Sequence, residues 1–465
     1  MFYGRESELQ KLEKLYTTND FQCVILYGRR RVGKTTLIGE FCKDKKVIFF
    51  SALETTGAAN LKVLSKAVNS YLYPDSKANM AYGEFEDVFT KIYETAQKEH
   101  IVFVIDEYPY LASSDKSISS ELQHFIDHMF SRTNIFIILC GSSMSFMENQ
   151  VLGYKSPLYG RRTAQFKLEP LTYLKTAEAH RELSKADNAL IYGITGGIPH
   201  YINKLNVSNG LDEAIIEGFL DKTSYLFEEP NNLLKQELRE PSVYNAIIAA
   251  IADGASKLNV IATKVRLESG PCSKYLSVLI SLGIIGKKTP VACGIKNKVL
   301  YFIKDNLFNF WFRFVPENIS AIVADKTATV YQREIKPYLN SYMGKIFENI
   351  CLQYLVNFAE NLPFIPREIG SWWGGNPETK QPEEIDIIAI NGKDAIFCEC
   401  KWENKPVELG VLDNLKRKAD IFKQFSRKYY YLFSKSGFSS GVADAANKDN
   451  FLRLIDLDAL YKSAF

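Results

Sequence analysis

Short apolar runs alternate with longer mixed stretches over the first third of the chain. Four of these runs, near residues 22–27, 47–51, 101–105 and 135–140, have apolar side chains at almost every position. Runs of this length without polar alternation are typical of strands buried on both faces of a parallel sheet. The stretches between them are typical of helices. The pattern therefore predicts an α/β fold with a doubly wound parallel sheet covered by helices.

Residues 241–305 show a different pattern. SVYNAIIAAIADG predicts a helix that stops at Asp253 and Gly254, and SKLNVIATKV and GPCSKYLSVLISLGII predict two more helices. IGKKTPVACGIKNKVLYFI predicts two strands around a basic hairpin. Three helices and a hairpin predict a winged helix-turn-helix, whose third helix and wing would face a DNA groove. The alternative is a winged helix that packs only against protein. The basic residues of the wing are Lys287, Lys288, Lys296 and Lys298.

A third pattern begins near residue 341. SYMGKIFENICLQYLVNFA predicts an amphipathic helix that contains Glu348, EEIDIIAING a strand that contains Asp386, and AIFCECKW the returning strand. An Asn-Gly pair between the two strands is typical of a hairpin turn. Alternate residues of a strand share a face, so Glu399 and Lys401 are expected to point to one side and the neighbouring cysteines to the other.

Composition and charge restrict the classes of protein. A length of 465 residues is too great for one ordinary core. The net charge of +3 excludes a surface that is positively charged throughout, so any surface that binds nucleic acid must be a local basic patch. The eight cysteines offer no second close pair to complete a zinc site, and no apolar run is long enough to span a bilayer. We expect reduced thiols, a cytoplasmic location and no membrane partner.

The stretch ILYGRRRVGKTTLI contains the clearest candidate site. Its residues 28–35 fit G-x-x-x-x-G-K-[ST], between a predicted strand and a predicted helix, which is the context that a phosphate-binding loop requires. Loop amides and the helix N-terminus would hold the phosphates, Lys34 would reach the β and γ phosphates, and Thr35 would offer its hydroxyl to Mg²⁺. The expected nucleotide-binding residues are Gly28, Arg29, Arg30, Arg31, Val32, Gly33, Lys34, Thr35 and Thr36.

Two further strand ends supply candidate polar groups. IVFVIDEYPYL ends a strand in Asp106 and Glu107, where a Mg²⁺ ligand and a water-polarising carboxylate belong. NIFIILCGSSMSFM ends another in Gly141-Ser142-Ser143. A polar residue there would sense the γ phosphate, and the alternative is a serine-rich turn.

Several motifs occur together in one order: FYGRESELQKL, GRRRVGKTTLI, IDEYPYL, GSSMSFM, PLYGRRTAQFKLEPL and TGGIPHYI. This set resembles the archaeal-type P-loop ATPase family, which is related to the AAA+ and STAND ATPases. The resemblance implies ATP as the nucleotide, with Phe2, Arg5 and Glu6 near the adenine. It also implies a helical lid that includes Gly196 to Pro199.

The same resemblance makes Arg161 or Arg162 an arginine-finger candidate. A solvated basic pair is the alternative. A finger that acts on a neighbouring copy would imply a homo-oligomer.

The C-terminal constellation Glu348…Asp386…Glu399-x-Lys401 resembles the PD-(D/E)xK nuclease superfamily. The resemblance implies that Glu348, Asp386 and Glu399 hold a divalent metal through oxygen ligands. Lys401 would stabilise the charge on the attacked phosphate or position the attacking water. The alternative is a nuclease fold that binds DNA without cleaving it.

We therefore expect a protein that binds and hydrolyses ATP with Mg²⁺, coupled to DNA binding or DNA processing, with a nuclease-like domain. The alternatives are a nucleotide-gated switch that binds DNA or protein without nuclease chemistry, and a chaperone-like ATPase. The expected parts are a P-loop core at 1–165, a helical lid at 166–238, a winged helix at 239–310, a linker at 311–340 and a nuclease-like domain at 341–465.

Overall fold

The computed structural model describes residues 2–75, 81–292, 298–376 and 380–462. The chain forms two compact units. The first comprises residues 1–170 together with the short stretch 198–200, and the second comprises residues 171–197 and 201–465.

The first unit is built on a parallel sheet of five strands in the order β2-β3-β4-β1-β5. The four predicted strands are present, the third and fourth of them one residue later than expected, and a fifth strand is added after them. The strands are β1 (Gln22–Tyr27), β2 (Val47–Ser51), β3 (Val102–Asp106), β4 (Phe136–Gly141) and β5 (Ala164–Lys167). The predicted doubly wound parallel sheet is confirmed.

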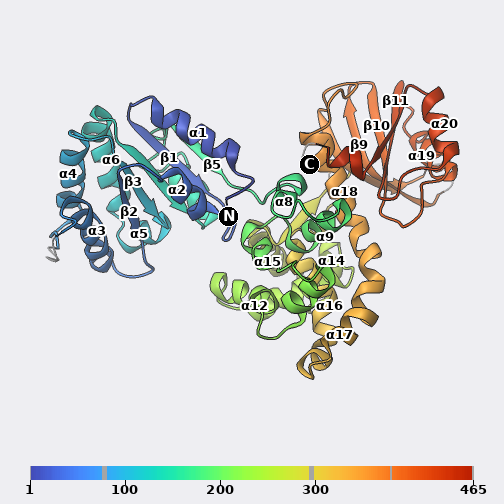
Figure 1. Ribbon diagram of the computed structural model, residues 1–465, viewed down its shortest axis with the longest axis horizontal. Coiled ribbons are helices and arrows are strands. Elements are labelled where there is room, and N and C mark those ends of the chain that lie inside the picture. The colour runs from blue at the N-terminus through green and yellow to red at the C-terminus, as the bar shows by residue number, and fades with distance from the viewer. Residues whose placement is uncertain (1, 76–80, 293–297, 377–379, 463–465) are drawn as a thin grey trace. The chain divides into compact units, whose positions relative to one another are not determined.

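Helices cover both faces of this sheet (Figure 1). Because successive strand residues point to opposite faces, Val24 and Leu26 pack in one core with α1 and α2, while Ile25 and Tyr27 pack in the other core with α3 to α6. The helices of this unit are α1 (Glu6–Thr17), α2 (Lys34–Phe41), α3 (Gly57–Leu72), α4 (Phe85–Ala96), α5 (Tyr108–Ser114), α6 (Ile118–His128) and α7 (Met144–Phe146).

The strand order determines where the polar strand ends lie. Strand β4 lies between β1, which leads into the phosphate loop, and β3, which ends in Asp106. All three strands are parallel, so their carboxyl ends meet at one edge of the sheet. The loop after β1, the acidic pair after β3 and Ser142 after β4 therefore share that edge.

The second unit begins with helices and continues into the predicted three helices and hairpin. The early helices are α8 (Tyr173–Ala177), α9 (Lys185–Thr195), α11 (Leu211–Ile215) and α12 (Tyr225–Glu237). Between α9 and α11 lies α10 (Pro199–Ile202), whose first two residues belong to the first unit. These helices are followed by α13 (Pro241–Ala252), α14 (Leu258–Lys264), α15 (Ser269–Ser281) and the antiparallel strands β6 (Ile285–Lys288) and β7 (Leu300–Ile303). This is the order of elements in a winged helix-turn-helix. The wing residue Lys296 lies outside the described residues.

Residues 311–340, expected to be a linker, are helical. Helix α16 (Asn306–Val323) includes the whole aromatic run NLFNFWFRFV, and Pro316 lies inside the helix without ending it. Phe310, Trp311 and Phe314 are buried, and the Trp311 indole donates to the Phe227 carbonyl at 2.8 Å. Burial of this aromatic face stabilises the helix through and beyond the proline. Helices α17 (Thr327–Val330) and α18 (Leu339–Asn357) follow.

The C-terminal part has a mixed sheet in the order β12-β11-β10-β9-β8. The predicted hairpin joins β9 to β10, and β10, β11 and β12 are mutually parallel. The strands are β8 (Glu368–Gly375), β9 (Pro382–Asn391), β10 (Asp394–Lys401), β11 (Arg427–Ser434) and β12 (Leu452–Asp456), and the helices are α19 (Leu409–Ala419), α20 (Ser440–Lys448) and α21 (Leu457–Leu460). Within the described ranges, no helix combines the length and the apolar character needed to cross a bilayer.

Candidate functional site

The backbone between Gly28 and Lys34 is bent as a phosphate loop requires. Gly33 has φ +91°, a left-handed conformation that side chains rarely allow, and it precedes the first residue of α2. A Cβ on Gly28 would lie 2.4 Å from the carbonyl oxygen of Leu168, so only glycine fits there. Val32 is fully buried, which fixes the loop to the core below it.

Lys34 is held inside this loop. Its ammonium donates to the carbonyl oxygens of Gly28 at 2.9 Å and of Arg29 at 3.1 Å, and the residue is only 7% exposed. Burial lowers the pKa of Lys34, although the nearby Cys140, Glu107 and Asp106 partly oppose that shift. A phosphate group at the loop would replace neutral carbonyl partners with charged ones.

Thr35 and Asp106 supply paired oxygen atoms. The Thr35 hydroxyl donates to a carboxylate oxygen of Asp106 at 3.3 Å, and Asp106 is 7% exposed. Hard oxygen donors this close together can bind the same Mg²⁺ ion, so these residues fit the metal that the loop motif implies. Thr36, the next residue of α2, is exposed.

Glu107 is held by the end of the neighbouring strand. Its carboxylate accepts from the backbone amide of Ser142 at 3.2 Å and from the Ser142 hydroxyl at 2.9 Å. Its own backbone is left-handed, with φ +51°, and its amide donates to Asp106 at 3.0 Å. These bonds hold the Glu107 carboxylate at the edge of the sheet where β3 and β4 both end.

Two arginines tie the loop to its surroundings. Arg5 donates to the carbonyl oxygens of Val32 and Glu169, which places the N-terminal segment against the loop. Arg30 donates to the Tyr110 hydroxyl at 2.8 Å. Arg31, like Gly33, has a positive φ, of +72°.

The stretch 198–200 also lies against the loop. A Cβ on Gly33 would lie 3.8 Å from the Pro199 ring. The His200 amide donates to the Arg31 carbonyl at 3.4 Å.

The two arginine-finger candidates differ in their contacts. Arg161 forms a fork with Asp127, with two N–O distances of 2.7 Å, and also donates to two backbone carbonyls. No ion pair of this kind holds Arg162 among the contacts of the described residues. Arg162 is therefore the less constrained of the two guanidinium groups.

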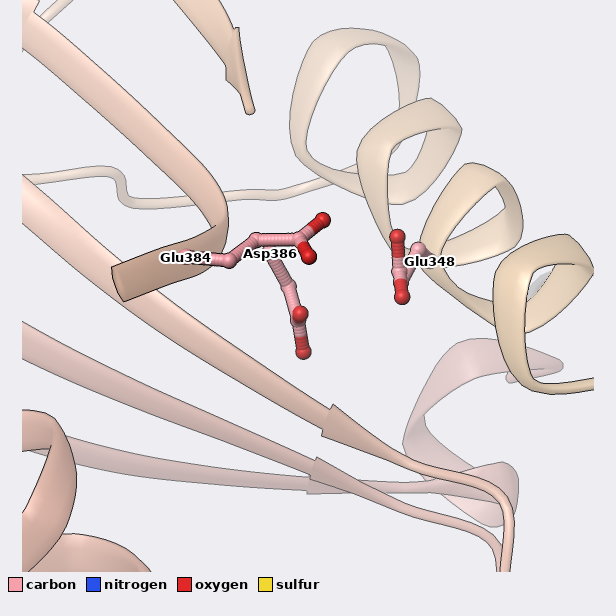
Figure 2. Close-up of side chains that lie close together, drawn as sticks. All are labelled: Glu348, Glu384 and Asp386. Carbon is pink, nitrogen blue, oxygen red and sulfur yellow. The ribbon is translucent and has the colours of Figure 1, made fainter. Parts of the chain in front are cut away.

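A second group of carboxylates lies in the C-terminal part. Glu348 on α18 and Glu384 and Asp386 on β9 each place a carboxylate oxygen within 4.8 Å of the other two, and their side chains point toward one another (Figure 2). We call these three residues the acidic cluster. The β9–β10 ladder ends at Ile387 and Cys398, and beyond it the Asp386 carboxylate accepts the Cys400 amide at 2.8 Å.

Mutual repulsion and burial act on this acidic cluster. Burial, followed by the neighbouring Asp386 carboxylate, raises the pKa of Glu348 to about 7. Burial and then Glu399 raise the pKa of Asp386 above its ordinary value. The negative charges of these carboxylates repel one another, and a divalent cation bound between their oxygen atoms would relieve that repulsion.

Glu399 and Lys401 lie together, as the alternation of the strand predicts. Their side chains form an ion pair at 2.7 Å, and Lys418 of α19 approaches the other Glu399 oxygen at 3.3 Å. Although burial alone lowers the pKa of Lys401, Glu399 raises it overall. Lys401 therefore stays charged, as a group that stabilises phosphate charge must.

Comparisons with known proteins identify the family. Residues 2–205 match an ATPase domain predominantly from Archaea, and residues 311–418 match archaeal and bacterial proteins of unknown function. An uncharacterized protein of Methanocaldococcus jannaschii is 33% identical in an alignment 452 residues long, which covers 94% of this chain and 96% of that protein. The chain belongs to the archaeal-type P-loop ATPase family.

Two other relatives agree with this assignment. An uncharacterized ATP-binding protein of Pyrococcus horikoshii is 22% identical in an alignment 275 residues long, which covers 52% of this chain and 77% of that protein. The solved structure of a Walker-type ATPase of Pyrococcus abyssi matches the fold with a TM-score of 0.53 and 20% identity, over 67% of this chain and 96% of that one. Because residues 2–205 match an ATPase domain, this P-loop ATPase is an enzyme that binds and hydrolyses ATP.

Sequence reasoning missed one member of the acidic cluster in this ATPase. Glu384 was not among the expected metal ligands, yet it completes the group with Glu348 and Asp386. A signal was available, because residues 384 and 386 of one strand share a face. Glu399, an expected metal ligand, forms ion pairs with Lys401 and Lys418 in this structure.

Proposed function

We propose that this ATPase couples ATP hydrolysis to metal-dependent cleavage of DNA. The observation that supports the second activity is the acidic cluster, three carboxylates within 4.8 Å of one another, beside the Glu399–Lys401 pair on the next strand. A cluster of oxygen ligands with an adjacent ammonium group suits phosphodiester hydrolysis.

At the nucleotide site, residues 28–36 cradle the phosphates of ATP. Lys34 leaves its carbonyl partners for the β and γ phosphates, and Thr35 and Asp106 hold Mg²⁺. Glu107 orients the attacking water, and Ser142 positions Glu107. Arg162, or Arg161 after it leaves Asp127, stabilises charge at the γ phosphate of a neighbouring copy in a homo-oligomer.

At the C-terminal site, Glu348, Glu384 and Asp386 hold a divalent metal, which supplies Lewis acidity when bound. Glu399 keeps the Lys401 ammonium at the edge of the cluster. Lys401 then stabilises negative charge on the attacked phosphate or positions the attacking water.

Candidate DNA contacts come from the winged-helix part and from α19. Lys274 on α15 and Lys287 on β6 are exposed, as is Lys423 after α19. The other basic residues of α19 have acidic partners: Lys416 pairs with Asp449, and Arg417 forms a fork with Glu383. Exposed lysines without such pairs are better placed to contact a phosphate backbone.

The test compares plasmid cleavage in Mg²⁺ or Mn²⁺ by the full chain and by Asp386→Asn, with ATPase turnover measured on the same preparations. Cleavage should fall at least about a hundredfold in Asp386→Asn while ATPase turnover persists. Asp413→Asn, an exposed acid on α19, is the matched control and should cleave like the wild type. Equal cleavage, or equal absence of cleavage, by wild type and Asp386→Asn would refute the nuclease assignment.

A nucleotide-gated switch without nuclease chemistry is the second candidate. It is favoured by the ion pairs at the acidic cluster, where Lys345 already pairs with Glu348 and Glu384. This candidate predicts salt-sensitive DNA binding that changes with ATP and no cleavage in any metal. A chaperone-like ATPase would show no salt-sensitive DNA binding at all.

A further inference from the structure

Val291 and Ala292, which follow β6, lie against the C-terminal sheet. The Val291 amide donates to the Ser371 carbonyl of β8 at 3.0 Å, and the side chains of Val291 and Ala292 pack against the apolar core of the C-terminal sheet. A Cβ on Gly370 would lie 3.0 Å from a methyl group of Val291, so the approach of the two segments is close. We call residues 288–292 the wing segment.

This contact brings Lys288 to the acidic cluster. The Lys288 ammonium lies 5.3 Å from the ring centre of Trp373 on β8. Trp373 on β8 lies directly opposite Glu384 on β9, and residues that face each other across two strands have neighbouring side chains. The Lys288 ammonium over the Trp373 ring therefore lies beside the acidic cluster. Burial, followed by the neighbouring Lys345 ammonium, lowers the pKa of Lys288, whereas the carboxylates of Glu384, Glu348 and Asp386 oppose that shift.

A second ammonium lies in the cluster itself. Lys345 approaches Glu384 at 2.8 Å and Glu348 at 3.0 Å, which are two of the three carboxylates that would bind a metal. Lys345 and Lys288 therefore supply positive charge where a divalent cation would supply it.

We propose that the wing segment is an intramolecular plug of the metal site. While Val291 is bound to β8, Lys288 and Lys345 neutralise the acidic cluster and compete with the divalent cation for it. This inference rests on the proposed metal site and adds its regulation. Release of the wing segment removes one of the two ammonium groups, so metal affinity rises. By thermodynamic reciprocity, metal binding must also loosen the wing segment.

The test measures Mn²⁺ affinity of the full chain without nucleotide, from the electron paramagnetic resonance signal of free Mn²⁺. Lys288→Ala should bind Mn²⁺ about tenfold more tightly than the wild type. Lys287→Ala is the matched control, because it removes the same charge from the exposed neighbouring residue and should leave the affinity unchanged. Gly370→Val, which crowds Val291 without changing any charge, should tighten binding in the same direction as Lys288→Ala.

A second readout needs no variant. Hydrogen exchange at the Val291 amide should become faster when wild-type protein is saturated with Mn²⁺, because its hydrogen bond to Ser371 is released. In Asp386→Asn, Mn²⁺ should leave this exchange unchanged.

The outcomes separate the plug from the metal site on which it rests. If Asp386→Asn binds Mn²⁺ as well as the wild type, the metal site itself is wrong. If Asp386→Asn loses binding but Lys288→Ala and Gly370→Val bind like Lys287→Ala, the metal site stands and the plug is wrong. If Lys287→Ala and Lys288→Ala increase the Mn²⁺ affinity equally, the increase reflects only the lower net charge of the protein. That result would also overturn the plug.

Discussion

The nucleotide site and the acidic cluster both combine lysines with carboxylates, but they balance charge in different ways. At the nucleotide site Lys34 bonds to backbone carbonyls, and Glu107 accepts from Ser142, so both charged groups have neutral partners. At the acidic cluster Lys345 pairs directly with two of the carboxylates. Lys34 can leave its neutral carbonyl partners for a charged phosphate at little cost in free energy. At the acidic cluster, a metal ion can bind only after the ion pairs of Lys345 are broken, which costs more free energy.

The two sites are also assembled differently along the chain. The phosphate loop is one continuous stretch, fixed by Gly28 and Gly33, with Asp106 and Glu107 at a neighbouring strand end. The acidic cluster joins a helix to a strand that begins 25 residues after that helix ends, at residue 382 against residue 357. The first site is therefore expected to tolerate less local change, and the second to depend more on packing between elements.

The largest expected effect is the loss of ATP hydrolysis in Lys34→Ala. Removal of the ammonium that reaches the transferred phosphate should lower ATPase turnover at least about a hundredfold. Steady-state phosphate release measures it, and Lys43→Ala, which removes an exposed lysine just after α2, should keep wild-type turnover. If Lys34→Ala hydrolyses ATP within twofold of the wild-type rate, the phosphate loop is not the site of hydrolysis.

Glu107→Gln should separate nucleotide binding from hydrolysis. The amide keeps the size of the side chain but cannot polarise water, so turnover should fall about a hundredfold while ATP affinity changes little. Ser142→Ala removes one of the two bonds to Glu107 and should give a smaller loss. Single-turnover hydrolysis and equilibrium binding of a labelled nucleotide measure the two quantities. A parallel loss of affinity and turnover in Glu107→Gln would contradict its role in activating water.

Gly28→Ala should destabilise the first unit. The added methyl group would collide with the Leu168 carbonyl, which is backbone and cannot rotate away, so the free energy of unfolding should fall by about 1–3 kcal/mol. Urea unfolding of Gly28→Ala against Gly39→Ala provides the measurement, because a Cβ on Gly39 meets no atom within 4 Å. Equal stability of the two variants would show that the loop has room to shift.

The smallest expected effect is a pH dependence at the acidic cluster in metal-free buffer. Burial and the neighbouring Asp386 carboxylate raise the folded-state pKa of Glu348 to about 7 from its ordinary value of 4.5, so the folded protein holds that proton more tightly. Its contribution to stability is fully present below about pH 4.5 and is lost as pH rises to about 7. Glu348→Gln should therefore gain about 1 kcal/mol over the wild type between those pH values, measured by urea unfolding. A constant difference between the two proteins would contradict the raised pKa.

The sequence predicted those features that depend on neighbouring residues. The phosphate loop is defined by eight consecutive residues, and the parallel strands by continuous apolar runs, so both could be placed from the pattern alone. The alternation of β10 likewise predicted that Glu399 and Lys401 lie together. Local periodicity and fixed spacing decide such features before tertiary packing does.

Features that depend on distant contacts were not predictable in this way. The wing lysines were expected to face DNA, but the position of Lys288 depends on the contact of Val291 with a strand 80 residues later. Residues 311–340 were expected to be a linker, and their helix is stabilised by burial of aromatic residues against other helices. Glu384 joins the acidic cluster only because β9 lies beside α18.

The stretch 198–200 has a practical consequence for the boundaries of the catalytic module. The chain returns there to the first unit after nearly thirty residues outside it, and Pro199 covers the glycine that opens α2. A fragment cut at residue 170 would lack that cover, even though it would contain every strand of the sheet. The smallest fragment that preserves the surroundings of the nucleotide must extend to about residue 205, which is also where the match to the archaeal ATPase domain ends.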